Sequence, residues 1–232
     1  MRIGIIGPGK VGGTLGRHFA EMGHGVMFGS RHPAALDGLV ATTGQKSCAD
    51  SIGKAAEYGE VVVLALPFDV LHEVAVALAH LLAGKLVIDT SNRYQRPAED
   101  GEGQARSDRA TSNVQELAQK LPDSHIVKAF NTMPVSVLAD QAGRPEPHTI
   151  AVYFSGNDAR TNAIARSLIV DTGFAPVAVG DLDDARLQEP DGPLYGKILS
   201  RAEAERMLAI ALRMAPKQQR PGDRRERNTA IH

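Results

Sequence analysis

The chain contains one cysteine, no tryptophan, few aromatic residues and almost no net charge. Cys48 is the only thiol among 232 residues, so an internal disulfide framework is excluded and a reducing compartment is expected. Aromatic residues make up 4% of the chain, which argues against stacking platforms for nucleic-acid bases. The formal net charge is −1, so no basic bias indicates nucleic acid or an anionic membrane as a partner.

Long apolar runs are also missing. A membrane-spanning helix needs about 18 or more consecutive apolar residues, and the apolar stretches here are interrupted by Asp69, His72 and Glu73, or by Gly84 and Lys85. The N-terminus enters a strand pattern directly, without the apolar segment and cleavage site of a signal peptide. The sequence therefore predicts a cytoplasmic protein without a membrane partner.

Short apolar runs alternate with helical patterns along the first 130 residues. Strands are expected at 2–6, 24–29, 60–67, 85–89 and 125–130, and helices at 11–23, 33–43 and 69–82. This alternation is typical of right-handed βαβ units. It predicts an α/β protein with a Rossmann-type, doubly wound parallel sheet.

A second αβ pattern follows. Strands are expected at 149–156 and 173–180, and helices at 158–171 and 201–214. No linker separates this pattern from the first, so residues 1–148 are interpreted as the nucleotide-binding domain and 149–214 as a small C-terminal extension of the same sheet. Residues 215–232 are basic and polar and are expected to be a disordered tail. The polar segment 93–112 is either a surface loop or an active-site lid.

The first apolar strand is followed by a glycine-rich turn that opens a helix. Gly7 allows a tight turn, Gly9 lets a ligand approach the backbone, and Gly12 lets the helix pack close to the strand. The N-terminus of the helix offers N–H groups and a positive dipole end to phosphates. The turn predicts a dinucleotide pyrophosphate site made of Gly7, Pro8, Gly9, Lys10, Val11 and Gly12.

The second strand ends in Ser30-Arg31, where an NAD-binding unit would carry an acidic residue to hold the ribose 2′-OH. A guanidinium makes charge-assisted bonds to a phosphate, and a hydroxyl adds a further donor. The pair therefore predicts a 2′-phosphate and the cofactor NADP(H).

Further candidates follow later strands at the same edge of the sheet, where open α/β sheets bind ligands. Leu66 and Pro67 are expected to wall the cofactor. Asn92 and Asn131 follow the next two strands and are expected to contact the nicotinamide ribose and carboxamide.

No constellation of general acids and bases is evident, and no histidines have metal-ligand spacing. No catalytic side chain and no metal site are therefore predicted. A dehydrogenase of hydroxy acids needs a proton carrier for the carbonyl or hydroxyl oxygen of its substrate, whereas hydride exchange between two redox rings depends mainly on their placement.

These stretches resemble a known family, the NADPH-dependent coenzyme F-420 reductases and their dinucleotide-binding relatives, which include the reductase domains of membrane ferric reductases. The similar segments reach nearly to residue 213, and Val127-Lys128-Ala129-Phe130-Asn131-Thr132 is the most specific of them. The resemblance implies a homodimer in which Ala129 also lies along the cofactor. It further implies that the deazaflavin ring of coenzyme F-420 stacks against the nicotinamide near residues 131–134.

The leading hypothesis is an NADP(H)-dependent oxidoreductase that exchanges hydride with a small-molecule acceptor, either coenzyme F-420 or a flavin. Two alternatives stay open. One is an imine or carbonyl reductase whose substrate pocket is built by residues 135–213. The other is a non-enzymatic NADPH-binding redox sensor whose basic tail recruits a partner.

Overall fold

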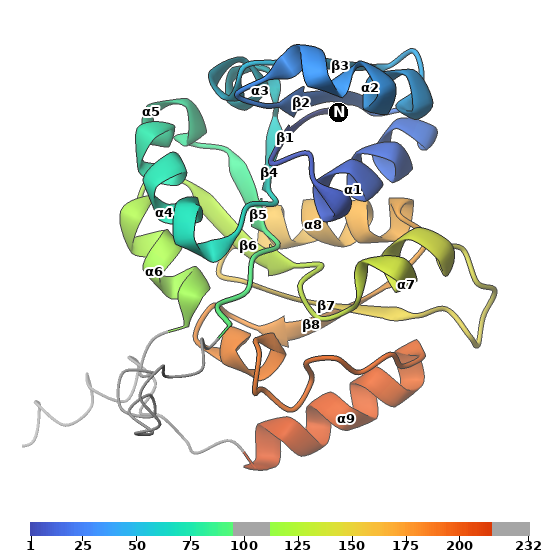
Figure 1. Ribbon diagram of the computed structural model, residues 1–232. Coiled ribbons are helices and arrows are strands. Elements are labelled where there is room, and N and C mark those ends of the chain that lie inside the picture. The colour runs from blue at the N-terminus through green and yellow to red at the C-terminus, as the bar shows by residue number, and fades with distance from the viewer. Residues whose placement is uncertain (95–111, 215–232) are drawn as a thin grey trace, which may run out of the picture.

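The computed structural model describes residues 1–94 and 112–214, which build an eight-stranded sheet flanked by helices (Figure 1). The strand order is β3-β2-β1-β4-β5-β6-β7-β8. The strands are β1 (Arg2–Ile6), β2 (Gly25–Gly29), β3 (Ser47–Asp50), β4 (Val61–Leu64), β5 (Leu86–Asp89), β6 (His125–Ala129), β7 (Ala151–Gly156) and β8 (Ala175–Gly180). The predicted Rossmann-type α/β fold is confirmed.

The sheet is parallel from β3 to β6, but β7 pairs with β6 in the antiparallel direction. The expectation of a wholly parallel sheet is therefore wrong at this one junction. The connection between these strands contains the helix α7 (Val135–Asp140), whose six residues span about 9 Å. So short a helix does not carry the chain back along β6, so β7 starts beyond the carboxyl end of that strand. The helix α8 (Ala159–Asp171) does return the chain, and β8 is parallel to β7.

Helices cover both faces of the sheet (Figure 1). On one face, α1 (Lys10–Glu21), α7 and α8 bury apolar side chains such as Phe19, Leu138 and Leu168. On the other face, α3 (Ile52–Tyr58), α4 (Phe68–Ala77), α5 (Ala79–Leu82) and α6 (Asn113–Lys120) bury a second set that includes Leu71 and Leu117. The helix α9 (Arg201–Met214) packs against the β7–β8 end of the sheet.

The expected strands and most of the helices are present, with shifts at their ends. The helix expected over 69–82 divides into α4 and α5 at Leu78, and the one expected over 33–43 divides into a 3-10 turn η1 (Pro33–Leu36) and α2 (Asp37–Thr43). A further 3-10 turn, η2 (Asp184–Gln188), follows β8.

Five elements had no prediction, namely β3, α3, α6, α7 and η2. β3 lies at the edge of the sheet and its sequence, Ser-Cys-Ala-Asp, lacks an apolar run.

No helix in the described ranges is both long and apolar enough to cross a membrane. The expected tail at 215–232 lies outside the described residues. So does most of the segment 93–112, of which Arg93, Tyr94 and Ser112 are described.

Candidate dinucleotide-binding site

The glycine-rich turn joins β1 to α1 at the carboxyl edge of the sheet. Gly7 has φ +92°, and a Cβ atom there would lie 2.5 Å from the carbonyl oxygen of Ala65. A Cβ on Gly12 would lie 2.3 Å from the carbonyl oxygen of Gly7. Both positions therefore require glycine, because a side chain would collide with backbone.

Gly9 differs, because a Cβ placed there would meet nothing within 4 Å in the described structure. Gly9 is the N-cap of α1, and no described side chain caps the helix at this end. The first turn of α1 also has no acidic residue, so its positive dipole end is not neutralised from within the helix. The open space above Gly9 and this helix end fit a pyrophosphate, with Pro8, Lys10 and Val11 around it.

Ser30 and Arg31 directly follow β2, the strand adjacent to β1. The Arg31 side chain is exposed and forms no hydrogen bond or ion pair with another described residue. The Ser30 Oγ accepts a hydrogen bond of 3.0 Å from the His32 N–H, and the Ser30 N–H donates to the Asp50 carbonyl at 3.0 Å. The two side chains fit a 2′-phosphate of NADP(H).

An acidic residue stands near this pair, which the sequence did not reveal. Asp50 ends β3 and pairs in register with Gly29, directly before Ser30. Its Oδ1 accepts a hydrogen bond of 2.6 Å from the N–H of Ser51. The carboxylate is therefore engaged at the start of α3, and Arg31 supplies the positive charge beside it.

The next strand ends place the remaining predicted residues at the same edge. Leu66 is partly buried and Pro67 is exposed, between the end of β4 and the start of α4. Ala129 is different, since its side chain is fully buried in the core between the sheet and α1. Its side chain therefore packs in the protein interior and does not line the edge.

Asn92 and Asn131 form a reciprocal amide pair. Asn131 Nδ2 donates to Asn92 Oδ1 at 2.9 Å, and Asn92 Nδ2 donates to the main-chain carbonyl oxygen of Asn131 at 2.8 Å. Asn131 Nδ2 also donates to the Gln188 carbonyl at 2.8 Å. Asn131 Oδ1 is buried and has no hydrogen-bond partner among the described residues. The two Nδ2 hydrogen bonds orient that oxygen.

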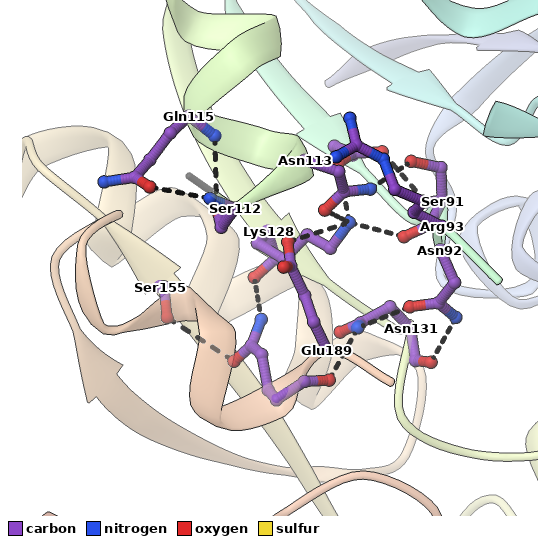
Figure 2. Close-up of polar contacts among 12 residues, drawn as sticks. Ser91, Asn92, Arg93, Ser112, Asn113, Gln115, Lys128, Asn131, Ser155 and Glu189 are labelled. Carbon is purple, nitrogen blue, oxygen red and sulfur yellow. Dashed lines mark hydrogen bonds and ion pairs between the residues drawn. The ribbon is translucent and has the colours of Figure 1, made fainter. Parts of the chain in front are cut away.

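A buried charged cluster lies behind this amide pair (Figure 2). Lys128 is fully buried, and its Nζ donates to Asp89 Oδ2 at 2.8 Å and to Asn113 Oδ1 at 3.1 Å. It also donates to the Ser91 carbonyl. Glu189 approaches to 4.0 Å, and burial raises the pKa of its carboxyl although Lys128 opposes the shift. The sequence predicted no site role for these three charged residues: Asp89 and Lys128 were expected only within the strands at 85–89 and 125–130, and Glu189 carried no expectation.

Two tyrosines extend the same edge outward. The hydroxyls of Tyr94 and Tyr195 lie 2.9 Å apart, and Asn92 Nδ2 reaches Tyr94 at 3.3 Å. Burial raises the pKa of Tyr195, and the hydrogen bond with Tyr94 raises it further. The residue directly after Tyr195 is held near the site, since the Gly196 N–H donates to the Thr132 carbonyl at 2.9 Å. The tyrosines therefore lie next to residues 131–134, where the resemblance places the second ring.

The structure thus brings the glycine turn, Ser30-Arg31, Leu66-Pro67, Asn92 and Asn131 to one edge of the sheet. Residues 2–93 match the family described as NADP oxidoreductase coenzyme F420-dependent. The predicted resemblance is confirmed, and the chain contains the NADP-binding fold of an oxidoreductase.

The curated relatives that this chain matches are longer proteins. Metalloreductase STEAP3 of Rattus norvegicus is 31% identical over 185 residues, which cover 80% of this chain and 35% of the relative. Human metalloreductase STEAP2 is 29% identical over 188 residues and is covered to 34%. The chain therefore spans about a third of the length of the curated relatives it matches.

Solved structures match over most of their length. The protein SMa0349 of Sinorhizobium meliloti is 28% identical, with a TM-score of 0.75, and the match covers 87% of this chain and 95% of that one. A protein of Arthrobacter sp. FB24, named as an F420-dependent NADP-reductase, is 24% identical with a TM-score of 0.67. The match covers 92% of this chain and 93% of that one and shows the shared fold.

Proposed function

We propose that this chain is an NADP(H)-dependent oxidoreductase that transfers hydride between NADP(H) and a deazaflavin (coenzyme F-420) or flavin-type acceptor. One observation carries the proposal. The open space above Gly9 at the start of α1 and the Arg31 side chain after β2, which has no hydrogen bond or ion pair with another described residue, follow neighbouring strands at one edge of the sheet. This combination suits a pyrophosphate and a 2′-phosphate of the same dinucleotide. The match of residues 2–93 to the family described as NADP oxidoreductase coenzyme F420-dependent supports the same cofactor.

In this proposal the residues of the chain bind NADP(H) and orient its nicotinamide. The glycine turn holds the pyrophosphate, and Ser30 with Arg31 holds the 2′-phosphate. Leu66 and Pro67 wall the groove, and the Asn92–Asn131 pair faces the nicotinamide end. Bound NADP(H) supplies the hydride chemistry, so no side chain has to act as a nucleophile. The aromatic faces of Tyr94 and Tyr195 suit a planar acceptor ring beyond the amide pair.

A second candidate is reduction of an imine or carbonyl, and one observation favours it. Such a reaction needs a proton donor, and the Tyr94–Tyr195 hydroxyl pair supplies one at the outer end of the site. The phenol of Tyr195 is protonated across the neutral range, and its raised pKa means that it gives up its proton less readily than an exposed tyrosine does. A reduced deazaflavin or flavin can instead take its proton at a ring nitrogen that is open to water.

An acceptor panel tests these proposals. Purified protein and NADPH are mixed separately with coenzyme F-420, flavin mononucleotide and a set of small imines, and NADPH oxidation is followed by absorbance. We expect turnover with a ring acceptor, and Tyr195→Phe is expected to leave that rate nearly intact. Turnover of imines alone, lost in Tyr195→Phe, would establish the second candidate. Tight NADPH binding without turnover of any acceptor would favour the redox sensor.

The family resemblance implies a homodimer, and the sequence by itself predicts a cytoplasmic protein. We propose that the protein acts as a homodimer in the cytoplasm on a small-molecule acceptor. Light scattering of the purified protein measures the first point, and a monomer at all concentrations would contradict it. Fractionation of the source cells measures the second.

A further inference from the structure

Lys128 connects three separate parts of the site. Its register partner across the parallel β5–β6 pair is Asp89, which it contacts at 2.8 Å. It also donates to the Ser91 carbonyl after β5 and to Asn113 Oδ1 in the first turn of α6. An ammonium has three N–H donors, so these three acceptors saturate it. Glu189, at 4.0 Å, is left without a hydrogen bond from this group.

Both members of the amide pair are attached to this cluster. The carbonyl of Ser91, which precedes Asn92 in the chain, accepts from Lys128 Nζ. On the other side, the Lys128 carbonyl accepts a hydrogen bond of 3.1 Å from Gln188 Nε2, and the Gln188 carbonyl accepts from Asn131 Nδ2 at 2.8 Å. The two amides are therefore joined to each other and, through separate partners, to the same lysine (Figure 2).

The backbone between Lys128 and Asn131 supports this arrangement. Phe130 has φ +60°, in the left-handed region that side chains other than glycine seldom adopt. Such a conformation persists only where the surroundings determine it, and it turns the chain so that Asn131 faces back toward Asn92.

We propose that Lys128 is a positioning residue for hydride transfer, because it fixes the Asn92–Asn131 pair that orients the nicotinamide end of the cofactor. The proposal rests on the proposed function. A fold-stabilising role alone would be met equally by an apolar pair, since a buried ion pair loses hydration that apolar side chains of similar volume do not. The ionic pair differs from an apolar one in holding the Ser91 carbonyl and Asn113 at defined positions.

The test compares a broken pair with an apolar replacement. Lys128→Met leaves the Asp89 carboxylate buried and alone, whereas Asp89→Leu/Lys128→Met removes both charges and keeps the volume filled. Lys85→Met is the matched control. Lys85 Nζ donates to the Ala56 carbonyl at 2.7 Å and the Glu57 carbonyl at 3.0 Å, just before β5 begins and at the opposite edge of the sheet.

Three properties are measured on each variant, namely the melting temperature, the Kd for NADPH, and the kcat and KM with the acceptor that wild-type protein reduces. We expect the double variant to melt near wild type and to bind NADPH within about twofold, because Arg31 and the glycine turn are distant from the change. Its kcat is expected to fall about 10- to 100-fold, the loss that small misplacement of a reacting group produces. Lys85→Met is expected to retain the wild-type kcat.

A readout without turnover accompanies these rates. Bound NADPH fluoresces more strongly when its nicotinamide is held in place, and we expect the double variant to lose this enhancement at saturating NADPH. The proposal would be overturned if the double variant matched wild-type protein in kcat and fluorescence as well as in melting temperature. Lys128 would then have a structural role only.

A second variant tests the proposal even if the Lys128 variants fail to fold. Asn113→Ala removes one of the three acceptors without stranding a charge, and an unchanged kcat and fluorescence there would also overturn the proposal. If wild-type protein turns over no acceptor, the proposed function fails instead, and the fluorescence comparison still decides the role of Lys128.

Discussion

Asp89 and Lys128 face each other in register across two parallel strands, with 2.8 Å between Lys128 Nζ and Asp89 Oδ2 and no exposure of either side chain. Both residues lie on the sheet face covered by α6, Asp89 as the last residue of β5 and Lys128 one position before the end of β6. A buried ion pair at the ligand-binding edge of an open α/β sheet joins the fold to the site, because moving either strand end would separate the charges.

Removing one member of this pair should destabilise the protein strongly. Lys128→Met leaves a carboxylate without its counter-charge in the core, which costs about 3–5 kcal/mol in comparable pairs. Chemical denaturation should show this loss in the free energy of unfolding. Lys54→Met, which breaks an exposed ion pair with Glu57, should leave that free energy unchanged. Similar results for the two variants would contradict the stabilising role of the buried pair.

Two glycines of the turn should separate folding from binding. Gly9→Ala adds a methyl group to open space, so the free energy of unfolding should change little while NADPH binding weakens at least about tenfold through steric contact with the pyrophosphate. Gly12→Ala places the methyl group 2.3 Å from the Gly7 carbonyl oxygen and should lower both properties. Isothermal titration measures the NADPH affinity, and chemical denaturation measures the free energy of unfolding. Full NADPH affinity in Gly9→Ala would mean that the pyrophosphate lies elsewhere.

The guanidinium of Arg31 should determine the choice between NADPH and NADH. Arg31→Ala removes a charge-assisted contact to the 2′-phosphate, so NADPH affinity should fall by about 1–3 kcal/mol, or about 5- to 150-fold. NADH affinity should stay constant, and it serves as the control in the same titration. An equal loss for both cofactors, or tighter NADH than NADPH binding in wild type, would contradict the assignment of Ser30 and Arg31.

Stability should depend on pH through Glu189. Burial raises the pKa of its carboxyl above the ordinary 4.5, against the opposing charge of Lys128. The folded protein therefore binds more protons than the unfolded chain between 4.5 and the raised pKa, and the free energy of unfolding falls as pH rises through that window.

Glu189→Gln should remove this contribution. Relative to wild type, the variant should gain stability steadily as pH increases across the window, as measured by denaturation at a series of pH values. Parallel curves for the two proteins would show that Glu189 titrates normally. Lys128, Asp89 and the N–H groups of Asn113 and Val114 are the other groups that act on this carboxyl, and they are unchanged in the comparison.

Much of the fold could be predicted from the sequence because its signals are local. The apolar runs before Gly7, Gly29 and Pro67 are typical of buried parallel strands, and the glycine turn marks the β1–α1 junction. The edge strand β3 escaped prediction because one side of an edge strand is exposed and needs no apolar run. The antiparallel β7 escaped it because a strand's direction depends on the path of its connection and not on its own side chains.

The site divides in the same way. Ser30, Arg31, Asn92 and Asn131 were predicted because each follows a strand. Asp89 and Lys128 carried a signal of their own, since a charged residue within an otherwise apolar strand needs a buried partner. Only the pairing of β5 with β6 shows that each is the other's partner.

The sequence by itself determined the class of fold, the glycine turn and the Ser30-Arg31 pair, because turn geometry and charge type depend on residues close together in the chain. Only the tertiary structure decided how the acceptor end is built. Asn92, Asn131, Lys128 and Gln188 come from three distant segments, and their contacts exist because strand pairing and the return of the chain through β8 bring those segments together. Hydrogen bonds and buried ion pairs act over a few ångströms, so separation in sequence reveals nothing of them until the sheet has formed.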